Sequence, residues 1–175
     1  QLRKMLEALR HRPFHVIGTW IDESLGVYVG WIARKNSSSD GMPLQNDKGD
    51  VVLVFSGEEF SEAGGARRLI RLYEEDPSFL RGLNGRFHGL LIDKARGTVN
   101  LFNDRYGMHR LFYHESKEGF YFAAEAKGIL AVRPELRQVN EQSLGEFVAC
   151  SCILENRTLF EGIYSLPGGS NWGFR

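Results

Sequence analysis

The stretch that decides the fold lies between Phe87 and Ala123 and reads FHGLLID KARG TVNLF NDRYGMHR LFYHES KEG FYFA. It contains four short runs rich in aliphatic and aromatic residues, a composition typical of strands, at 87–92, 99–102, 111–114 and 120–123. The segments Lys94–Gly97 and Lys117–Gly119 have the composition of hairpin turns. Between the second and third runs, Asp104 is expected to set a turn with Arg105 and Gly107 by accepting hydrogen bonds from nearby backbone N–H groups.

Before this stretch the sequence predicts a helix, a hairpin, a buried strand and two further helices. Leu2, Met5, Leu6 and Leu9 have helical spacing, so the first ten residues form an amphipathic helix. The other predicted elements are a hairpin over 15–33, a loop over 35–49, a strand over 51–55 that ends in a tight turn, a helix containing 69–73 and a short helix after Pro77.

After it, two helices are predicted at 126–132 and 141–149, and a turn is predicted at Pro167-Gly168-Gly169. The order of these elements predicts an α+β protein with two antiparallel sheets layered between helices. Fold class alone does not identify a function.

Composition excludes several function classes. The 175 residues carry 22 Lys and Arg against 22 Asp and Glu, so the electrostatic attraction for nucleic acid is missing. The apolar runs are too short to cross a bilayer, and no secretory leader is visible, which makes the cytoplasm the default location. The five histidines lack a ligand spacing and no phosphate-binding loop is present, so neither a metal nor a cofactor is expected. Cys150 and Cys152 are predicted to be buried free thiols.

Five segments, in order along the chain, resemble the N-terminal glutaminase domain of asparagine synthetases and related class II glutamine amidotransferases. The closest match begins at Asn103-Asp104-Arg105-Tyr106-Gly107 and continues to Lys127. The other four lie at 5–13, 41–58, 72–87 and 157–169. Since these segments keep the family's order over nearly the whole chain, the sequence is identified as a member of that family.

The resemblance implies a four-layer αββα sandwich of the N-terminal-nucleophile hydrolase type. Residues 1–165 would form the glutaminase-like domain, and residues 166–175 would lead toward a synthetase half. In this family an N-terminal Cys attacks the glutamine side-chain amide, with its own α-amino group as base. Gln1 has no nucleophilic side chain and the family's Cys-bearing strand has no counterpart in the sequence, so no catalytic residue is assigned.

The same resemblance implies a remnant substrate site. Arg12 matches the arginine that holds the glutamine carboxylate, although it can equally bond the last carbonyls of the first helix. In the family, Asn-Gly-Glu forms the oxyanion hole at the position of Ser56, Gly57 and Glu58; alternatively, these three residues form only a turn after the strand. Gly57 keeps a backbone N–H that could serve as one donor. The Ser56 side chain is too short to replace that of Asn. The acidic clamp for the substrate ammonium falls at Gly64-Gly65-Ala66-Arg67, where no carboxylate is present.

Three functions therefore compete, and whether the chain is an enzyme stays open. The first is a degenerate glutaminase-like domain that acts as a scaffold for a synthetase domain of the same protein or a partner subunit. The second is a truncated active glutaminase that supplies ammonia for ATP-dependent asparagine biosynthesis by a ligase. The third is a non-catalytic binding module. In each case the expected ligand is at most a weakly bound, L-glutamine-like small molecule. A sheet edge left uncovered beside 25–33 or 51–55 makes a homo-oligomer possible.

Overall fold

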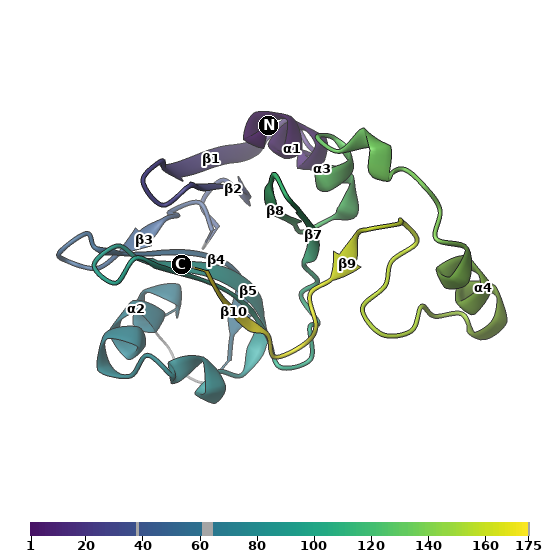
Figure 1. Cartoon of the computed structure of the whole chain (residues 1–175). Helices are drawn as coiled ribbons and strands as arrows, with labels where there is room; N and C mark the ends of the chain where they lie inside the picture. Colours follow the sequence, from purple (N-terminus) through teal and green to yellow (C-terminus); the bar gives the residue numbers. More distant parts are fainter. Residues whose placement is uncertain (38, 61–64, 175) are drawn as a thin grey trace. The chain divides into compact units, whose positions relative to one another are not determined.

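The computed structural model describes residues 1–37, 39–60 and 65–174 and divides the chain into two compact units. Unit 1 consists of residues 1–9 and 110–167, and unit 2 of the described residues in 10–109 and 168–175. Each unit has its own sheet and its own helices (Figure 1).

Unit 2 is built on a five-stranded antiparallel sheet with the order β10-β6-β5-β4-β3. These strands are β3 (Leu44–Gln45), β4 (Val51–Glu59), β5 (Gly85–Asp93), β6 (Thr98–Asn103) and β10 (Asn171–Phe174). A separate hairpin joins β1 (His15–Asp22) to β2 (Val27–Arg34). The helices of unit 2 are α2 (Gly65–Glu75) and the short 3-10 helix η1 (Phe79–Gly82).

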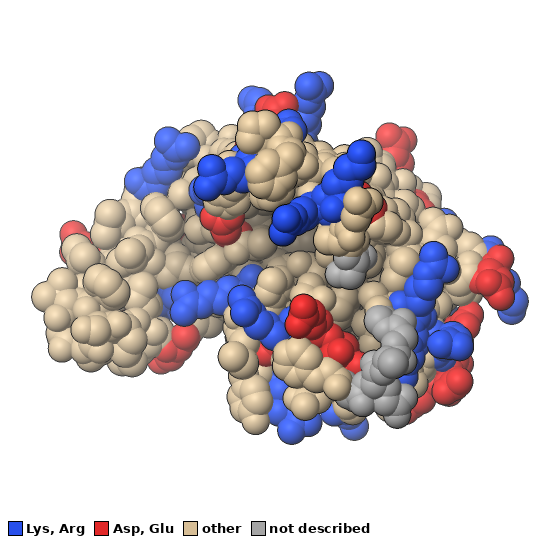
Figure 2. All heavy atoms as spheres, turned by 180° about the vertical axis from the view of Figure 1, so that it is seen from behind, with Lys and Arg blue, Asp and Glu red and all other residues tan. Residues whose placement is uncertain are grey.

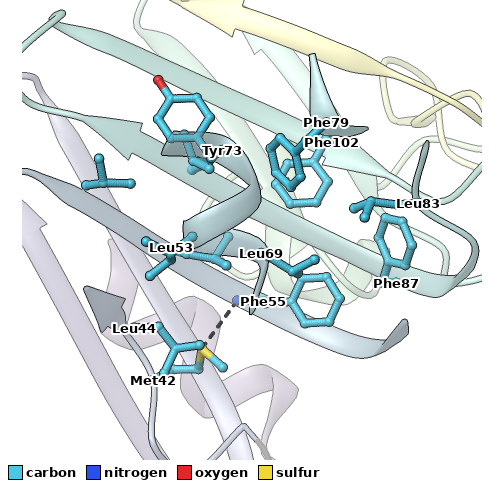
Figure 3. Close-up of a cluster of buried hydrophobic side chains, with 13 residues drawn as sticks. Met42, Leu44, Leu53, Phe55, Leu69, Tyr73, Phe79, Leu83, Phe87 and Phe102 are labelled. Carbon is cyan, nitrogen blue, oxygen red and sulfur yellow. Dashed lines mark hydrogen bonds between the residues drawn. The ribbon is translucent and has the colours of Figure 1, made fainter. Parts of the chain in front are cut away.

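The core of unit 2 fills the space between α2 and one face of this sheet (Figure 3). Strand residues alternate between faces, so Phe55, Phe87 and Phe102 share this face, with ring centroids 5.4 to 6.5 Å apart. Leu69 and Tyr73 of α2 pack against them. The amphipathic spacing seen in the sequence thus produces an apolar interface between helix and sheet.

Unit 1 is smaller and contains the three-stranded sheet β8-β7-β9. Its elements are α1 (Leu2–Leu9), β7 (Phe112–Ser116), β8 (Gly119–Ala123), α3 (Ala126–Leu130), η2 (Pro134–Leu136), α4 (Glu141–Cys150) and β9 (Tyr164–Ser165). Ile129 and Ile163 are fully buried at its centre, and Met5 and Leu9 of α1 pack against this cluster. The predicted inward stripe of the first helix is therefore confirmed.

The α+β class and the antiparallel sheets predicted from the sequence are confirmed. The four strands of the 87–123 stretch are β5, β6, β7 and β8, and the turns at 94–97 and 117–119 join them in pairs. Each unit packs helices against a sheet, which is compatible with the layered sandwich that the family implies.

Three predictions need correction. The strand that begins at Val51 does not end in a tight turn, because Gly57 and Glu58 pair in register with Phe87 and Arg86 and β4 continues to Glu59. The predicted loop over 35–49 contains the two-residue strand β3, which pairs with Leu53 and Val52, so 51–55 is not an open edge. Cys150 and Cys152 are exposed, not buried: Cys150 ends α4, which turns most of its surface to solvent, and Cys152 follows the helix.

The surface agrees with the balanced charge of the sequence. Figure 2 shows Lys and Arg side chains mixed with Asp and Glu side chains over much of one face.

None of the described helices is both long and apolar enough to span a bilayer. The described residues also contain no cluster of three or more His, Cys, Asp or Glu side chains that could hold a metal ion.

Candidate functional site

A row of polar side chains crosses the second face of the five-stranded sheet. Ser56 of β4 is the register partner of His88 of β5, and His88 is the partner of Asn103 of β6. The adjacent row on the same face is apolar and buried, and consists of Val54, Leu90 and Leu101. The sheet therefore changes from apolar to polar at this end, on the face opposite the aromatic core.

His109 closes over this row from the loop after β6. Its Nε2 lies 3.0 Å from the hydroxyl oxygen of Ser56. Its ring stacks on that of His88, with centroids 4.4 Å apart, and His88 Nδ1 donates to the His109 carbonyl at 3.3 Å. Two half-buried imidazoles and one hydroxyl are thus held in a single cluster, which we call the Ser56–His109–His88 cluster.

Asp104 sets the position of His109. This buried carboxylate accepts hydrogen bonds from four backbone N–H groups, those of Phe87 at 3.3 Å, Tyr106 at 3.1 Å, Met108 at 2.9 Å and His109 at 2.9 Å. The predicted role of Asp104 as the residue that shapes this turn is confirmed.

Gly57 follows Ser56 in a conformation that L side chains rarely adopt. Its φ is +110°, and a Cβ there would lie 2.1 Å from the Arg86 carbonyl oxygen. The carbonyl of its partner Phe87 accepts from Asp104 N at 2.9 Å, and the Phe87 N–H donates to the Asp104 carboxylate at 3.3 Å, so both backbone groups of Phe87 face Asp104 and not β4. In an antiparallel ladder this makes Gly57–Phe87 a non-hydrogen-bonded pair, so the N–H of Gly57 is directed away from β5.

Both imidazoles of the cluster are neutral at pH 7. Burial, together with the neighbouring His109, lowers the pKa of His88 to about 4. Burial also lowers the pKa of His109, and the positive charge of Arg86 acts in the same direction. For Asp104, burial raises the pKa, but the N–H groups of His109, Met108, Tyr106 and Phe87 outweigh burial, so the pKa lies below its ordinary value. A neutral His109 can accept a proton.

The low pKa of His88 predicts a loss of stability in acid. The unfolded ring binds a proton near pH 6.5 and the folded ring only near pH 4, so the unfolded state binds more protons between these values. We expect this group to remove about 3 kcal/mol of unfolding free energy as the pH falls from 7 to 4. Urea unfolding at both pH values measures the loss.

The matched variant for this measurement is His88→Gln, which keeps a polar side chain but does not titrate. Other groups titrate equally in both proteins, so the difference between their two pH slopes isolates His88. Parallel slopes would show that His88 has an ordinary pKa in the folded protein.

The other predicted site residues are not brought into this cluster by any contact described in the structure. Arg12 is exposed between α1 and β1, where its carbonyl accepts from His15 N at 3.1 Å. Glu58 is exposed and lies opposite Arg86 in the ladder. Of the segment predicted to replace the acidic clamp, Gly64 lies outside the described residues, and Arg67 is exposed in α2.

Sequence reasoning missed His88 and His109. The histidines were considered only as metal ligands, and Ser56 and His109 are 53 residues apart, so no local pattern joins them. The available signal was the turn 103–109, whose Asp104 both matches the family and positions His109.

A hollow of about 240 Å³ between α2 and η1 is lined by none of the residues of the candidate site.

Comparison with known proteins gives one family match and several distant relatives. A family model described as a glutamine amidotransferase domain matches residues 58–175. The protein Amidase chry2 of Gibberella zeae is 27% identical over 97% of this chain and 27% of its own length. Asparagine synthetase (glutamine-hydrolyzing) 2 of Bacillus subtilis is 26% identical over 96% of this chain and 25% of its own length. A putative asparagine synthetase (glutamine-hydrolyzing) 2 of Methanocaldococcus jannaschii is 23% identical over 98% of this chain and 40% of its own length. The chain thus spans a quarter to two fifths of the length of these relatives.

Proposed function

Since the chain belongs to the glutamine amidotransferase domain family, we propose that it is the glutaminase-like domain of an asparagine-synthetase-related protein and that this domain does not hydrolyse glutamine efficiently. The observation that carries this proposal is the bond between Ser56 Oγ and His109 Nε2, 3.0 Å long. In the family pattern an Asn at this position donates to the oxyanion. Here the hydroxyl oxygen of the shorter Ser lies within hydrogen-bonding distance of an imidazole nitrogen instead.

The loss of the Asn donor at position 56 is expected to lower the reaction rate by a known order of magnitude. Removing one donor from an oxyanion hole costs about 10² to 10³ in rate, because the charge of the tetrahedral intermediate is then poorly stabilised. Gly57 retains a backbone N–H directed away from β5, so one of the two expected donors remains. The retained Gly57 N–H supports the relationship to the family. The missing Asn side chain at position 56 supports reduced activity.

Binding of the substrate's charged groups is also weakened. An exposed Arg12 is screened by solvent, and an exposed ion pair contributes about 0 to 1 kcal/mol. The exposed Arg67 stands near the place of the family's acidic clamp, where it would repel the ammonium group of glutamine. We therefore propose a weak, carboxylate-selective remnant site. The partner of this domain is then a synthetase domain, on the same chain or on another subunit, for which it acts as a scaffold.

We expect the 175-residue chain to release no ammonia from L-glutamine above the buffer background. The reason is that the Ser56 side chain offers no amide donor and no thiol contacts the candidate site within the described residues. Ammonia is measured by a coupled assay at millimolar glutamine. Release that a thiol-reactive glutamine analogue abolishes would contradict the proposal and support an active glutaminase.

Calorimetry supplies the control for binding. L-glutamine and glutarate, which has two carboxylates and no ammonium, should bind with equal affinity, at millimolar dissociation constants or weaker. The variant Arg12→Ala should weaken both if Arg12 holds a carboxylate. Micromolar binding of glutamine would show that residues outside this set hold the ammonium group.

A further inference from the structure

The Ser56–His109–His88 cluster has features that a remnant oxyanion hole does not need. A serine hydroxyl lies within hydrogen-bonding distance of an imidazole nitrogen, at 3.0 Å, and that imidazole is neutral at pH 7. The pairing of a hydroxyl with an adjacent base is the arrangement that activates serine for covalent catalysis.

We propose that Ser56 is a nucleophile, with His109 as its general base, and that the pair cleaves activated carboxylic esters. This inference goes beyond the proposed function and does not depend on it, because neither glutamine nor an N-terminal thiol takes part.

The step is balanced with water as the only co-reactant. Ser56 Oγ forms a bond to the ester carbonyl carbon while its proton moves to His109 Nε2. The tetrahedral intermediate collapses, the bond from carbon to the leaving oxygen breaks, and His109 returns the proton to that oxygen. Water then hydrolyses the acyl-serine with His109 again acting as base, which regenerates the hydroxyl.

The tautomers of the two imidazoles are compatible with this role. The His109 carbonyl can only accept, so His88 carries its proton on Nδ1, which lies 3.3 Å from that oxygen. The Ser56 hydroxyl donates to His109 Nε2 when this nitrogen is unprotonated, which leaves it free to take the proton. The charged groups that act on His109 are Arg86, which favours the neutral ring, and Asp104, which favours the protonated ring.

Gly57 supplies the electrostatic element that the step needs. The backbone N–H directly after a nucleophilic serine is a common oxyanion donor. Here the residue after Ser56 has φ +110° and its N–H is directed away from β5. Asp104, through the His109 N–H at 2.9 Å, and the stacked His88 ring hold the base in position.

The test uses a fluorophosphonate probe and p-nitrophenyl acetate on the 175-residue chain. The Ser56 oxygen should displace fluoride from phosphorus, and peptide mass mapping should place the adduct on Ser56. The variants Ser56→Ala and His109→Gln should lower the rate of ester hydrolysis by about 100-fold or more, the scale of losing a nucleophile or general base. The control Ser116→Ala should leave it unchanged, since the Ser116 hydroxyl bonds a backbone carbonyl at 3.3 Å.

Three results would overturn the inference: no adduct on the wild-type chain, an adduct on another residue, or labelling of a folded His109→Gln at the wild-type rate. The adduct is mapped on the wild-type chain, so the test remains decisive even if a variant fails to fold. Glutamine hydrolysis is measured separately, so failure here and failure of the proposed function give different results.

Discussion

The substitution Asp104→Ala is expected to lower the free energy of unfolding by about 2 to 6 kcal/mol, against the roughly 5 to 15 kcal/mol typical of a domain. The Asp104 side chain is fully buried and accepts four backbone N–H groups at 2.9 to 3.3 Å. Each buried donor left without a partner costs about 1 to 3 kcal/mol. Water can replace the carboxylate only for the N–H groups of Tyr106 and Met108, because these two residues are exposed.

Urea unfolding of the wild-type chain and the variant measures this loss. The matched control is Asp76→Ala, because the exposed Asp76 also accepts from nearby groups, Ser78 N at 2.8 Å and Ser78 Oγ at 2.7 Å. We expect the control to lose much less than Asp104→Ala, because water can replace the exposed Asp76 carboxylate as a hydrogen-bond acceptor. Similar losses in the two variants would mean that the turn 104–109 does not depend on its central carboxylate.

The secondary structure could be predicted where a local pattern is complete. The first helix has apolar residues at helical spacing, and the hairpin at 15–33 and the four strands of the 87–123 stretch are rich in aliphatic and aromatic residues. Each of these elements is found close to its predicted position. The strand from Val51 was predicted too short because Gly57 and Glu58 break the apolar run. Pairing with β5 carries the strand through both residues.

The candidate site was predictable only in part. The family resemblance pointed to Ser56 and Gly57, which lie at the cluster, and to Arg12 and Glu58, which no described contact joins to it. The role of Asp104 followed from turn chemistry. The bond between Ser56 and His109 depends on the register of β4 with β5 and on the path of the loop after β6, neither of which a single sequence determines. The exposure of Cys150 was missed for a related reason, since burial of a thiol depends on what packs against its helix.

The sheet end that carries the candidate site depends on the close approach of two backbones. Gly57 lies opposite Phe87, and the Cβ of any larger residue would lie 2.1 Å from the Arg86 carbonyl oxygen and 2.8 Å from the Phe87 Cα. Neither atom belongs to a flexible side chain, so an added methyl group must push β4 and β5 apart. Such a movement would also displace Ser56 from His88, its partner in the ladder.

We expect Gly57→Ala to lower the unfolding free energy by about 3 to 5 kcal/mol, the sum of backbone strain at a positive φ and overpacking of the ladder. The control is Gly97→Ala, in the turn between β5 and β6, where φ is +61° and, apart from its chain neighbours, no atom of the described residues lies within 4 Å of the added Cβ. It adds the strain of a left-handed turn position without the overlap and should lose about 1 to 2 kcal/mol. Urea unfolding of both variants therefore tests whether alanine costs more at position 57 than at an open left-handed position. Equal losses would show that the two strands can move apart at Gly57 without cost, and the position of Ser56 would then not depend on the glycine that follows it.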